Sequence, residues 1–278
     1  MRRLRPYAVP YLLWMGLFIL IPTIILIILG FTNLELYNIG VFDITLVNFS
    51  IFVQDQVVNA LWNSLSYSFV TTLICFVIGY PVAYYLSTLS EKKRKILLAM
   101  MIVPLWSNML LRIIAWEKIF TPTSIIADIF GISLDLLGTP TGVLIGMIAM
   151  YLPFMIFPIF SVLEKMDYKL IEAAKDLGAS DLQTFVKVTF PLSSGGVVSG
   201  VIMTMLPAMT SFVLPARIGL GKINLIGNII ESKFMKEVLG SSGASINQGA
   251  IISLLLMVFS VISFVLITRV DKEGETLI

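Results

Sequence analysis

The chain has little of what soluble enzymes and nucleic-acid-binding proteins depend on. None of its 278 residues is a histidine, which removes the commonest general base, the usual catalytic triads and the commonest metal ligand. Its single cysteine, Cys75, lies in an apolar run and cannot form an internal disulfide, so we interpret it as a packing residue. Only 13% of the residues are charged, and the net charge of +2 does not indicate a basic surface of the kind that binds nucleic acid.

Hydrophobic residues, in contrast, make up 58% of the chain, which is more than a soluble domain needs. A membrane-spanning helix requires about 20 mostly apolar residues. The first such stretch follows three arginines and imitates a signal peptide, but it is too long for one and no A-x-A site follows it. We therefore expect a retained first span and one all-α transmembrane domain over 1–278, with six spans at 9–30, 62–88, 96–116, 141–163, 196–214 and 249–268.

Proline recurs inside these stretches and removes backbone donors that lipid cannot replace, which predicts bent helices that pack around one another. Small residues such as Gly142, Gly146 and Ala149 would let neighbouring helices approach closely. The prolines concerned are Pro22, Pro81, Pro104, Pro153, Pro158 and Pro207.

The distribution of Lys and Arg predicts the orientation. With six spans both ends share one side, and that side holds 13 of the 19 basic residues, against five on the opposite side and Arg112 within the membrane. Cytoplasmic loops carry the excess of basic residues, so we expect both termini in the cytoplasm.

A polar segment at 164–195, predicted to be cytoplasmic, interrupts the apolar runs. Asp167 is placed to cap a short helix whose apolar positions have helical spacing, and Gly178 suits its C-terminal cap. Ser180 with Gln183 has the spacing of a capping box that starts a second helix, which Pro191 is expected to close. Periodicity leaves two interpretations open: a helical hairpin that covers the end of the bundle, or a docking site for a soluble partner.

Within this segment, "EAAKDLG" followed by "VTFP" resembles the EAA motif of ABC-importer permeases. The matching positions keep the spacing of the motif, although Val188 and Phe190 stand where Ile and Leu are more usual. The resemblance implies the type I importer permease fold (MetI-like), a six-helix bundle in a bacterial inner membrane with a cytoplasmic coupling helix that binds an ATPase subunit. On this resemblance we expect ATPase coupling from Glu172, Ala173, Ala174, Asp176, Gly178, Ala179 and Pro191.

Five stretches, one of which includes the EAA residues, together resemble permeases of spermidine/putrescine importers of the PotB type: "GYPVAYYLS" at 79–87, "IVPLWSNMLLRIIAWEKIF" at 102–120, "YLPFMIFPIFSVLEKMD" at 151–167, "EAAKDLGASDLQTF" at 172–185 and "LIGNII" at 225–230. The resemblance implies a polyamine cargo. It also implies a second permease of PotC type and a polyamine-binding protein outside the cell.

The chain shows no means of hydrolysing ATP. It has no G-x-x-x-x-G-K-[ST] loop, and "GLGK" at 219–222 lacks the first glycine and the hydroxyl. We therefore predict a transport subunit and not an enzyme, with no cofactor in this chain and with ATP bound by a separate ATPase dimer.

A polycation is well served by carboxylates and by aromatic faces that accept ammonium groups. The first outer loop carries Glu35, Asp43 and Asp55, but the last outer loop carries Arg217, Lys222, Lys233 and Lys236. Aromatic residues near span ends are also common interfacial anchors. An intramembrane arginine suggests a partner carboxylate. Arg112 and Glu117 are five residues apart, and this spacing does not place them on the same face of a helix. The candidate substrate-path residues are Trp106, Arg112, Trp116, Glu117 and Tyr151.

Two alternatives stay open. The same machine could carry another small solute, such as an amino-acid derivative or an anion. A secondary transporter or channel that works without ATP is the third hypothesis.

Overall fold

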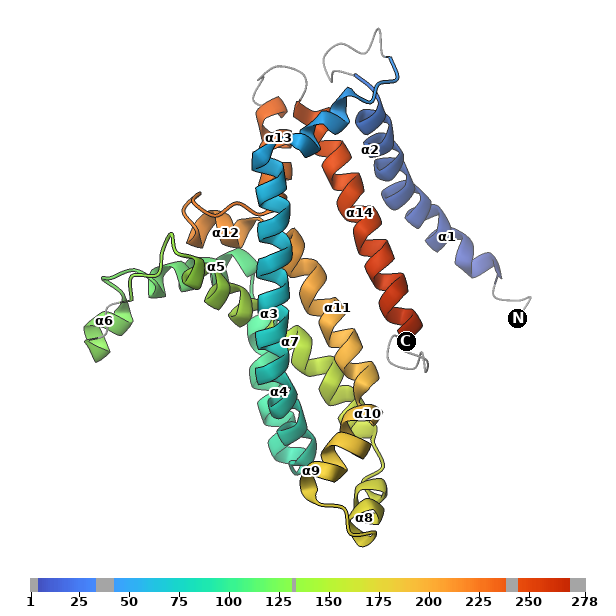
Figure 1. Ribbon diagram of the computed structural model, residues 1–278, viewed down its shortest axis with the longest axis vertical. Coiled ribbons are helices and arrows are strands. Elements are labelled where there is room, and N and C mark those ends of the chain that lie inside the picture. The colour runs from blue at the N-terminus through green and yellow to red at the C-terminus, as the bar shows by residue number, and fades with distance from the viewer. Residues whose placement is uncertain (1–4, 34–42, 132–133, 239–244, 271–278) are drawn as a thin grey trace. The chain divides into compact units, whose positions relative to one another are not determined.

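The computed structural model describes residues 5–33, 43–131, 134–238 and 245–270, so Glu35 lies outside the described residues. Within these ranges the regular structure is helical, apart from one isolated antiparallel bridge between Thr32 and Ile44 (Figure 1). Contacts divide the chain into two compact units, which we describe separately. The first comprises Met1–Ala60 with Ile229–Phe259, and the second Leu61–Asn228 with Ser260–Ile278.

The first unit holds the N-terminal span. Helix α1 (Arg5–Met15), a π-helical turn (Gly16–Leu20) and α2 (Ile21–Phe31) follow one another, and Val9–Phe31 is apolar enough to cross a membrane. The 3₁₀ turn Val47–Val53 is fixed to the end of α2 by Asn48, whose amide donates to the carbonyls of Gly30 and Thr32 at 3.0 and 2.9 Å. Leu29 packs against Ile246 and Ala250 of α14 (Ser245–Val270).

The second unit is built around α3 (Asp55–Thr88), α7 (Pro140–Lys165) and α11 (Ser194–Thr210). Cys75 of α3 is buried in the core that α3 forms with α7, as expected of a packing residue. Helices α7 and α11 are in close contact: a Cβ on Gly196 would lie 2.8 Å from the Pro158 carbonyl oxygen, and one on Gly200 would lie 2.8 Å from the Met155 sulfur. Glycine at these positions therefore sets the spacing of the two helices.

One of the six stretches expected to span is a bent pair, and a second bend lies just before the stretch 196–214. The stretch 96–116 consists of α4 (Glu91–Trp106) and α5 (Met109–Ile119), which meet at 97° instead of forming one straight helix. The break has a local cause, since Ser107 is extended and the Asn108 side chain accepts the Leu110 N–H at 2.8 Å, which starts a new helix.

The second bend lies at Ser193. Here α9 (Asp181–Thr184), a π-helical turn (Phe185–Thr189) and α10 (Phe190–Leu192) lead into α11 at 62°. Pro191 was expected to close the second helix of the 164–195 segment, and the helical run ends one residue after it, at Leu192. In the π-turn the Phe190 N–H donates to the Phe185 carbonyl, five residues back. The backbone hydrogen bonds therefore already depart from the α-helical pattern just before Pro191, which has no N–H to donate.

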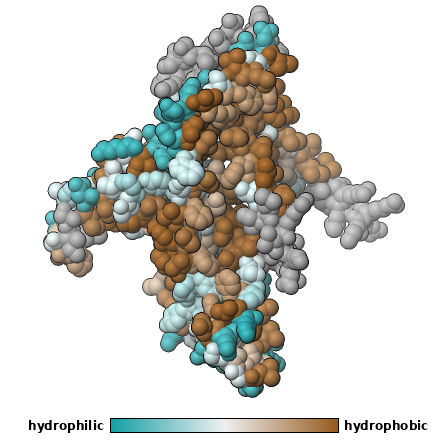
Figure 2. Space-filling model, viewed as in Figure 1, coloured by the Kyte–Doolittle hydropathy of each residue, from teal (hydrophilic) through white to brown (hydrophobic). Residues whose placement is uncertain are grey.

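Short helices complete the second unit. They are α6 (Ile125–Phe130), α8 (Lys169–Asp176), α12 (Val213–Ile218) and the start of α13 (Ile226–Val238). Leu214 and Ile218 of α12 pack against α7, where Gly146 leaves room for the Ile218 side chain. In Figure 1, α8 and α9 lie at one end of this unit and α5 and α12 lie toward the other. Figure 2 shows apolar side chains along the helices between them and more hydrophilic surface around α8 and α9.

Candidate functional site

The EAA-like residues lie on α8 and the turn that follows it, at the end of α7. Glu172, Ala173 and Asp176 are exposed on α8, and Ala174 is half-buried. The Asp167 carboxylate accepts the Lys169 N–H at 3.1 Å, so this side chain does bond the helix start, although Tyr168 occupies the N-cap position. The Tyr168 hydroxyl donates to Ser87 Oγ at 3.2 Å and ties the start of α8 to the end of α3.

The end of α8 is closed by Gly178. Its φ of +86° lies in the left-handed region, and a Cβ there would meet nothing within 4 Å. The Gly178 N–H donates to the Lys175 carbonyl at 2.9 Å, and the Ala179 N–H donates to the Ala174 carbonyl at 3.1 Å. This pair of bonds is the Schellman motif, so the C-cap expected at Gly178 is present.

The following turn starts α9 through a capping box. The Gln183 N–H donates to Ser180 Oγ at 3.3 Å, and the Ser180 N–H donates to Gln183 Oε1 at 3.0 Å. Lys175 Nζ lies 2.7 Å from Asp181 Oδ1 and joins α8 to α9. This contact raises the pKa of Lys175 and lowers that of Asp181. Because both groups are fully exposed, the pair fixes geometry more than it adds stability.

The apolar positions of this segment are only partly covered. Leu170 is exposed, Leu177 is 90% exposed and Leu182 is 72% exposed, whereas Ile171 and Phe185 are half-buried. A hairpin that served only to cover the bundle would turn these leucines inward. Large apolar side chains at an otherwise hydrophilic end mark an interaction surface.

An aromatic cluster connects this end to the spanning helices. Phe185 stacks edge-on against Tyr80 of α3 with ring centroids 5.6 Å apart, and Tyr80 lies 5.7 Å from Phe190. The Tyr80 hydroxyl and Ser193 Oγ are 2.7 Å apart in a buried hydrogen bond at the bend between α10 and α11. Through these contacts the turn that follows α9 packs against α3, and α3 in turn is bonded to the start of α11. The cluster comprises Phe76, Tyr80, Tyr84, Phe185 and Phe190.

The candidate path residues lie in three different environments. Trp106 ends α4 and is 88% exposed. Trp116 of α5 is half-buried and packs against Phe120, with ring centroids 5.4 Å apart. Tyr151 of α7 is buried, and its hydroxyl donates to the Pro207 carbonyl at 3.3 Å.

Arg112 and Tyr151 line the same cavity of about 410 Å³, between α5, α7 and the end of α11. Arg112 Nε and Ser211 Oγ are buried there with no hydrogen-bond partner among the described residues. This cavity is lined by Met109, Arg112, Met150, Tyr151, Phe154, Pro207, Thr210, Ser211, Phe212 and Val213.

Glu117 lies apart from this cavity. Its Oε2 is 3.7 Å from Arg217 Nη1, so the carboxylate joins α5 to α12. The structure therefore brings Arg112 and Tyr151 together and leaves Trp106, Trp116 and Glu117 elsewhere on α4 and α5.

A contact between Tyr80, Phe185 and Ser193 was not predicted from the sequence. No local signal distinguishes them, because aromatic residues and serine are common in apolar helices and the contact joins positions 113 residues apart. Within the ranges that the structure describes, no three His, Cys, Asp or Glu side chains gather as a metal site.

Comparison with known families gives one family match. The model described as "Binding-protein-dependent transport system inner membrane component" matches residues 76–273. The spermidine/putrescine transport system permease protein PotB of Haemophilus influenzae is 34% identical over 252 residues, covering 88% of each chain. The protein of the same name from Escherichia coli K12 is 35% identical over 269 residues, covering 94% of this chain and 98% of its own.

Solved structures give the same fold. A bacterial ABC transporter that imports the acidic polysaccharide alginate superposes with a TM-score of 0.74 over 98% of this chain and 96% of its own, at 15% identity. The inward-facing MetNI methionine ABC transporter gives a TM-score of 0.54 over 77% of this chain and 94% of its own, at 19% identity. At such identities the likeness concerns the fold alone, and it confirms the expected all-α, MetI-like permease architecture.

Proposed function

Because the chain belongs to the family of binding-protein-dependent transport system inner membrane components, we propose that it is one permease subunit of an ATP-driven importer and that its ATPase docks on α8. Membership makes the chain a membrane transport component and not an enzyme. The observation that carries the docking proposal is the exposed EAA-like surface at the end of the second unit, with Leu177 and Leu182 uncovered beside Glu172 and Asp176.

The contacts around α8 support a coupling role for this surface. The Schellman cap at Gly178, the capping box at Ser180 and the Lys175–Asp181 pair hold α8 and α9 in a fixed relation. The aromatic cluster then links α9 to α3 and α11. A rigid α8 pushed by an ATPase would thus move the spanning helices and not merely bend the loop. The coupling residues proposed are Glu172, Ala173, Ala174, Asp176, Gly178, Ala179 and Pro191.

Pro191 acts differently from the others in this scheme. It lies in α10, beyond the π-turn and two residues before the bend at Ser193. We assign it to shaping the bend, while the α8 residues contact the ATPase.

The proposed assembly has four kinds of component. Two ATPase subunits bind and hydrolyse ATP, a second permease of PotC type pairs with this chain, and a binding protein delivers the solute from outside. A solved relative supports the last component, since it is described as an alginate ABC transporter in complex with a pentasaccharide-bound periplasmic protein. We place both termini and the 164–195 segment in the cytoplasm, from the excess of basic residues on that side.

The proposed cargo is spermidine and putrescine, as in the names of the relatives at 34 and 35% identity. A second candidate is another small solute in the same class of importer, and Arg112 in the α5–α7 cavity favours one that carries a carboxylate. Import without ATP would leave the exposed α8 surface without a role.

The test is uptake of labelled spermidine into proteoliposomes that contain this chain, its ATPase, the second permease and the binding protein. We expect ATP-dependent uptake that putrescine competes and that Glu172→Lys abolishes while the chain still inserts and assembles. The matched control is Lys118→Glu, which reverses an exposed charge in the last turn of α5, outside the α8–α9 segment.

Each outcome has a distinct meaning. Uptake near the wild-type rate in Glu172→Lys would contradict coupling through α8. ATP hydrolysis stimulated by a binding protein without spermidine accumulation would keep the importer and reject the cargo. Uptake that follows an ion gradient and persists without the ATPase would reject the importer altogether.

A further inference from the structure

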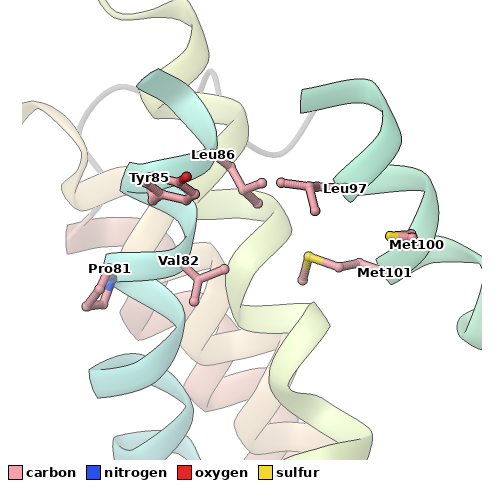
Figure 3. Close-up of a pocket in the computed structure, with 7 residues that line it drawn as sticks. All are labelled: Pro81, Val82, Tyr85, Leu86, Leu97, Met100 and Met101. Atoms are coloured by element: carbon pink, nitrogen blue, oxygen red, sulfur yellow. The ribbon is translucent and has the colours of Figure 1, made fainter. Parts of the chain in front are cut away.

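An apolar groove of about 440 Å³ lies between the end of α3 and the start of α4. Val82 and Leu86 point from α3 toward Leu97 and Met101 of α4 and form its floor, as Figure 3 shows. Tyr85 and Met100 form the rim, and both side chains are more than half exposed. The described residues leave the groove open along its length, and its remaining lining residue is Pro81.

One end of the groove is basic. Lys92 and Lys93 are exposed in the first turn of α4, one turn of helix before Leu97, and make no ion pair with any described residue. The other charges nearby are already matched, since Lys95 pairs with Glu91 at 2.5 Å and Arg94 pairs with Glu164 at 3.0 Å. Lys93 lies four residues before Leu97 and so shares the groove face of α4, and Lys92 precedes it in the same first turn.

The backbone adds donors at the same place. Ser90 is the N-cap of α4 but its side chain makes no capping bond, so the first N–H groups of the helix are not capped by this side chain. Oriented N–H groups at a helix start attract anions. The start of α4 thus carries the N–H groups and the lysines, and the groove between α3 and α4 begins about one turn later. A phospholipid has the same order, with a charged phosphate headgroup followed by an apolar acyl chain.

We propose that this groove is a binding site for one anionic phospholipid of the cytoplasmic leaflet. Lys92, Lys93 and the first turn of α4 bind the phosphate, and one acyl chain lies between Val82, Leu86, Leu97 and Met101. Basic sites between spanning helices on the cytoplasmic side select anionic lipids over zwitterionic ones. The leaflet assignment rests on the proposed orientation, in which the α8 end is cytoplasmic.

The site has a mechanical consequence for coupling. Arg94, next to the two lysines, joins α4 to the last turn of α7 through Glu164, and α8 begins five residues after Glu164. A lipid that holds the start of α4 against α3 would brace the helix end from which α8 projects. We expect anionic lipid to increase ATPase stimulation in the assembled transporter.

The primary test measures lipid selectivity and requires no transport. The assembled complex with Met100→Cys carries a spin label at the groove rim, and the native Cys75 of this chain is buried and does not compete. In nanodiscs of phosphatidylcholine with phosphatidylglycerol, we expect the label to report preferential contact with phosphatidylglycerol. Lys92→Gln with Lys93→Gln should lower that preference by about five-fold per lysine, and Lys118→Gln should leave it unchanged.

A second variant separates the groove from the charges. Leu97→Trp fills the floor while both lysines remain, and we expect it to displace the acyl chain and reduce selective contact. Equal contact of the two lipids in the wild type, or unchanged preference in the double-lysine variant, would overturn the proposal. A label shielded from all lipid would show instead that the second permease covers the groove, which also overturns it. Because the spin-label measurements require no transport, a failure of spermidine uptake would reject the proposed cargo and leave the proposed lipid site unaffected.

Discussion

Gly178 offers the sharpest test of the idea that a rigid α8 couples ATP hydrolysis to transport. Its φ of +86° is a conformation that L-residues adopt at a cost of about 1–2 kcal/mol. Since a Cβ at this position meets nothing within 4 Å, Gly178→Ala adds backbone strain and no steric clash. Within this chain the effect of the variant is therefore conformational, and the Asn variant below separates backbone strain from a clash with the docked ATPase.

The backbone strain in Gly178→Ala should weaken the affinity of the permease for the ATPase. Helix α8 is short and exposed, so we expect the variant to relieve the strain by opening the cap in the free subunit, and docking would then have to close the cap again. A cost of about 1–2 kcal/mol corresponds to a roughly 5–30-fold weaker apparent affinity for the ATPase. Titration of the ATPase onto the reconstituted permease pair measures this directly, and ATP-driven uptake should fall in parallel at limiting ATPase.

Two variants make the test decisive. Gly178→Asn should retain most of the affinity, because Asn tolerates the left-handed region. Gly131→Ala introduces the same kind of strain, at φ +67° with no atom within 4 Å, but at the end of α6. If Gly131→Ala weakens docking as much as Gly178→Ala does, or if neither does, the reasoning about α8 is wrong.

Three further predictions concern packing, the hydrogen bond at the bend and pH. Gly196→Ala forces a methyl group to within 2.8 Å of the Pro158 carbonyl oxygen and should cost about 1–3 kcal/mol, seen as a lower midpoint of thermal unfolding, whereas Gly16→Ala, which meets nothing within 4 Å, should not. Tyr80→Phe removes the 2.7 Å bond to Ser193, worth about 0.6 kcal/mol by the average for membrane helices, and should lower uptake per ATP hydrolysed; an equal effect of Tyr11→Phe at an exposed tyrosine would contradict this. The pKa of Asp181 is lowered, so the stabilisation that the Lys175–Asp181 pair gives to the α8–α9 turn is present above the ordinary pKa of Asp181 and is lost as pH falls through the lowered value. The pKa of Lys175 is raised, so at high pH the same stabilisation is lost only as pH rises through that raised value. ATPase docking should accordingly be flat around neutral pH, and a decline on mild acidification that persists in Asp181→Asn would assign the titration to another group.

The caps of the 164–195 segment were predictable because their signals are local. Ser180 and Gln183 are three residues apart, and the bonds of Gly178 and Ala179 reach back three and five residues. Such patterns are fixed by backbone geometry within one or two turns, so they survive in any tertiary context. The long apolar runs were predictable for a related reason, since length and hydropathy alone decide whether a helix can cross a bilayer.

The bends were not predictable in the same way. The stretch 96–116 is mostly apolar, and its hydropathy does not distinguish a straight helix from two helices at 97°. Asn108 is a possible N-cap in the sequence, but its role becomes visible only when Ser107 is extended. Pro191 lies one residue before the end of its helical run at Leu192, close to the end predicted, but the π-turn before it has no reliable signature in one sequence.

In the candidate site, the sequence does not reveal which residues contact each other across different helices. The sequence separates Arg112 from Glu117 correctly, because five residues place them on different faces of α5. It does not show that Glu117 faces Arg217, 100 residues away, or that Arg112 shares a cavity with Tyr151. These contacts depend on how α5 lies across α7 and α12, and that depends on the break at Ser107.

The charge arrangement bears on how a polycation could pass this subunit. In the α5–α7 cavity the lining includes Arg112 and no carboxylate, and the nearest candidate on α5, Glu117, is already matched by Arg217. A polyamine would meet a like charge there unless Arg112 is countered by a group that this chain's described residues do not provide. If the cargo is a polycation, the counter-charges for both the cargo and Arg112 then come from outside the described residues, and we expect them on the second permease. The contribution of this chain would be its apolar and aromatic walls at Tyr151 and Phe154, and cargo selectivity would belong to the pair of permeases and not to either one alone.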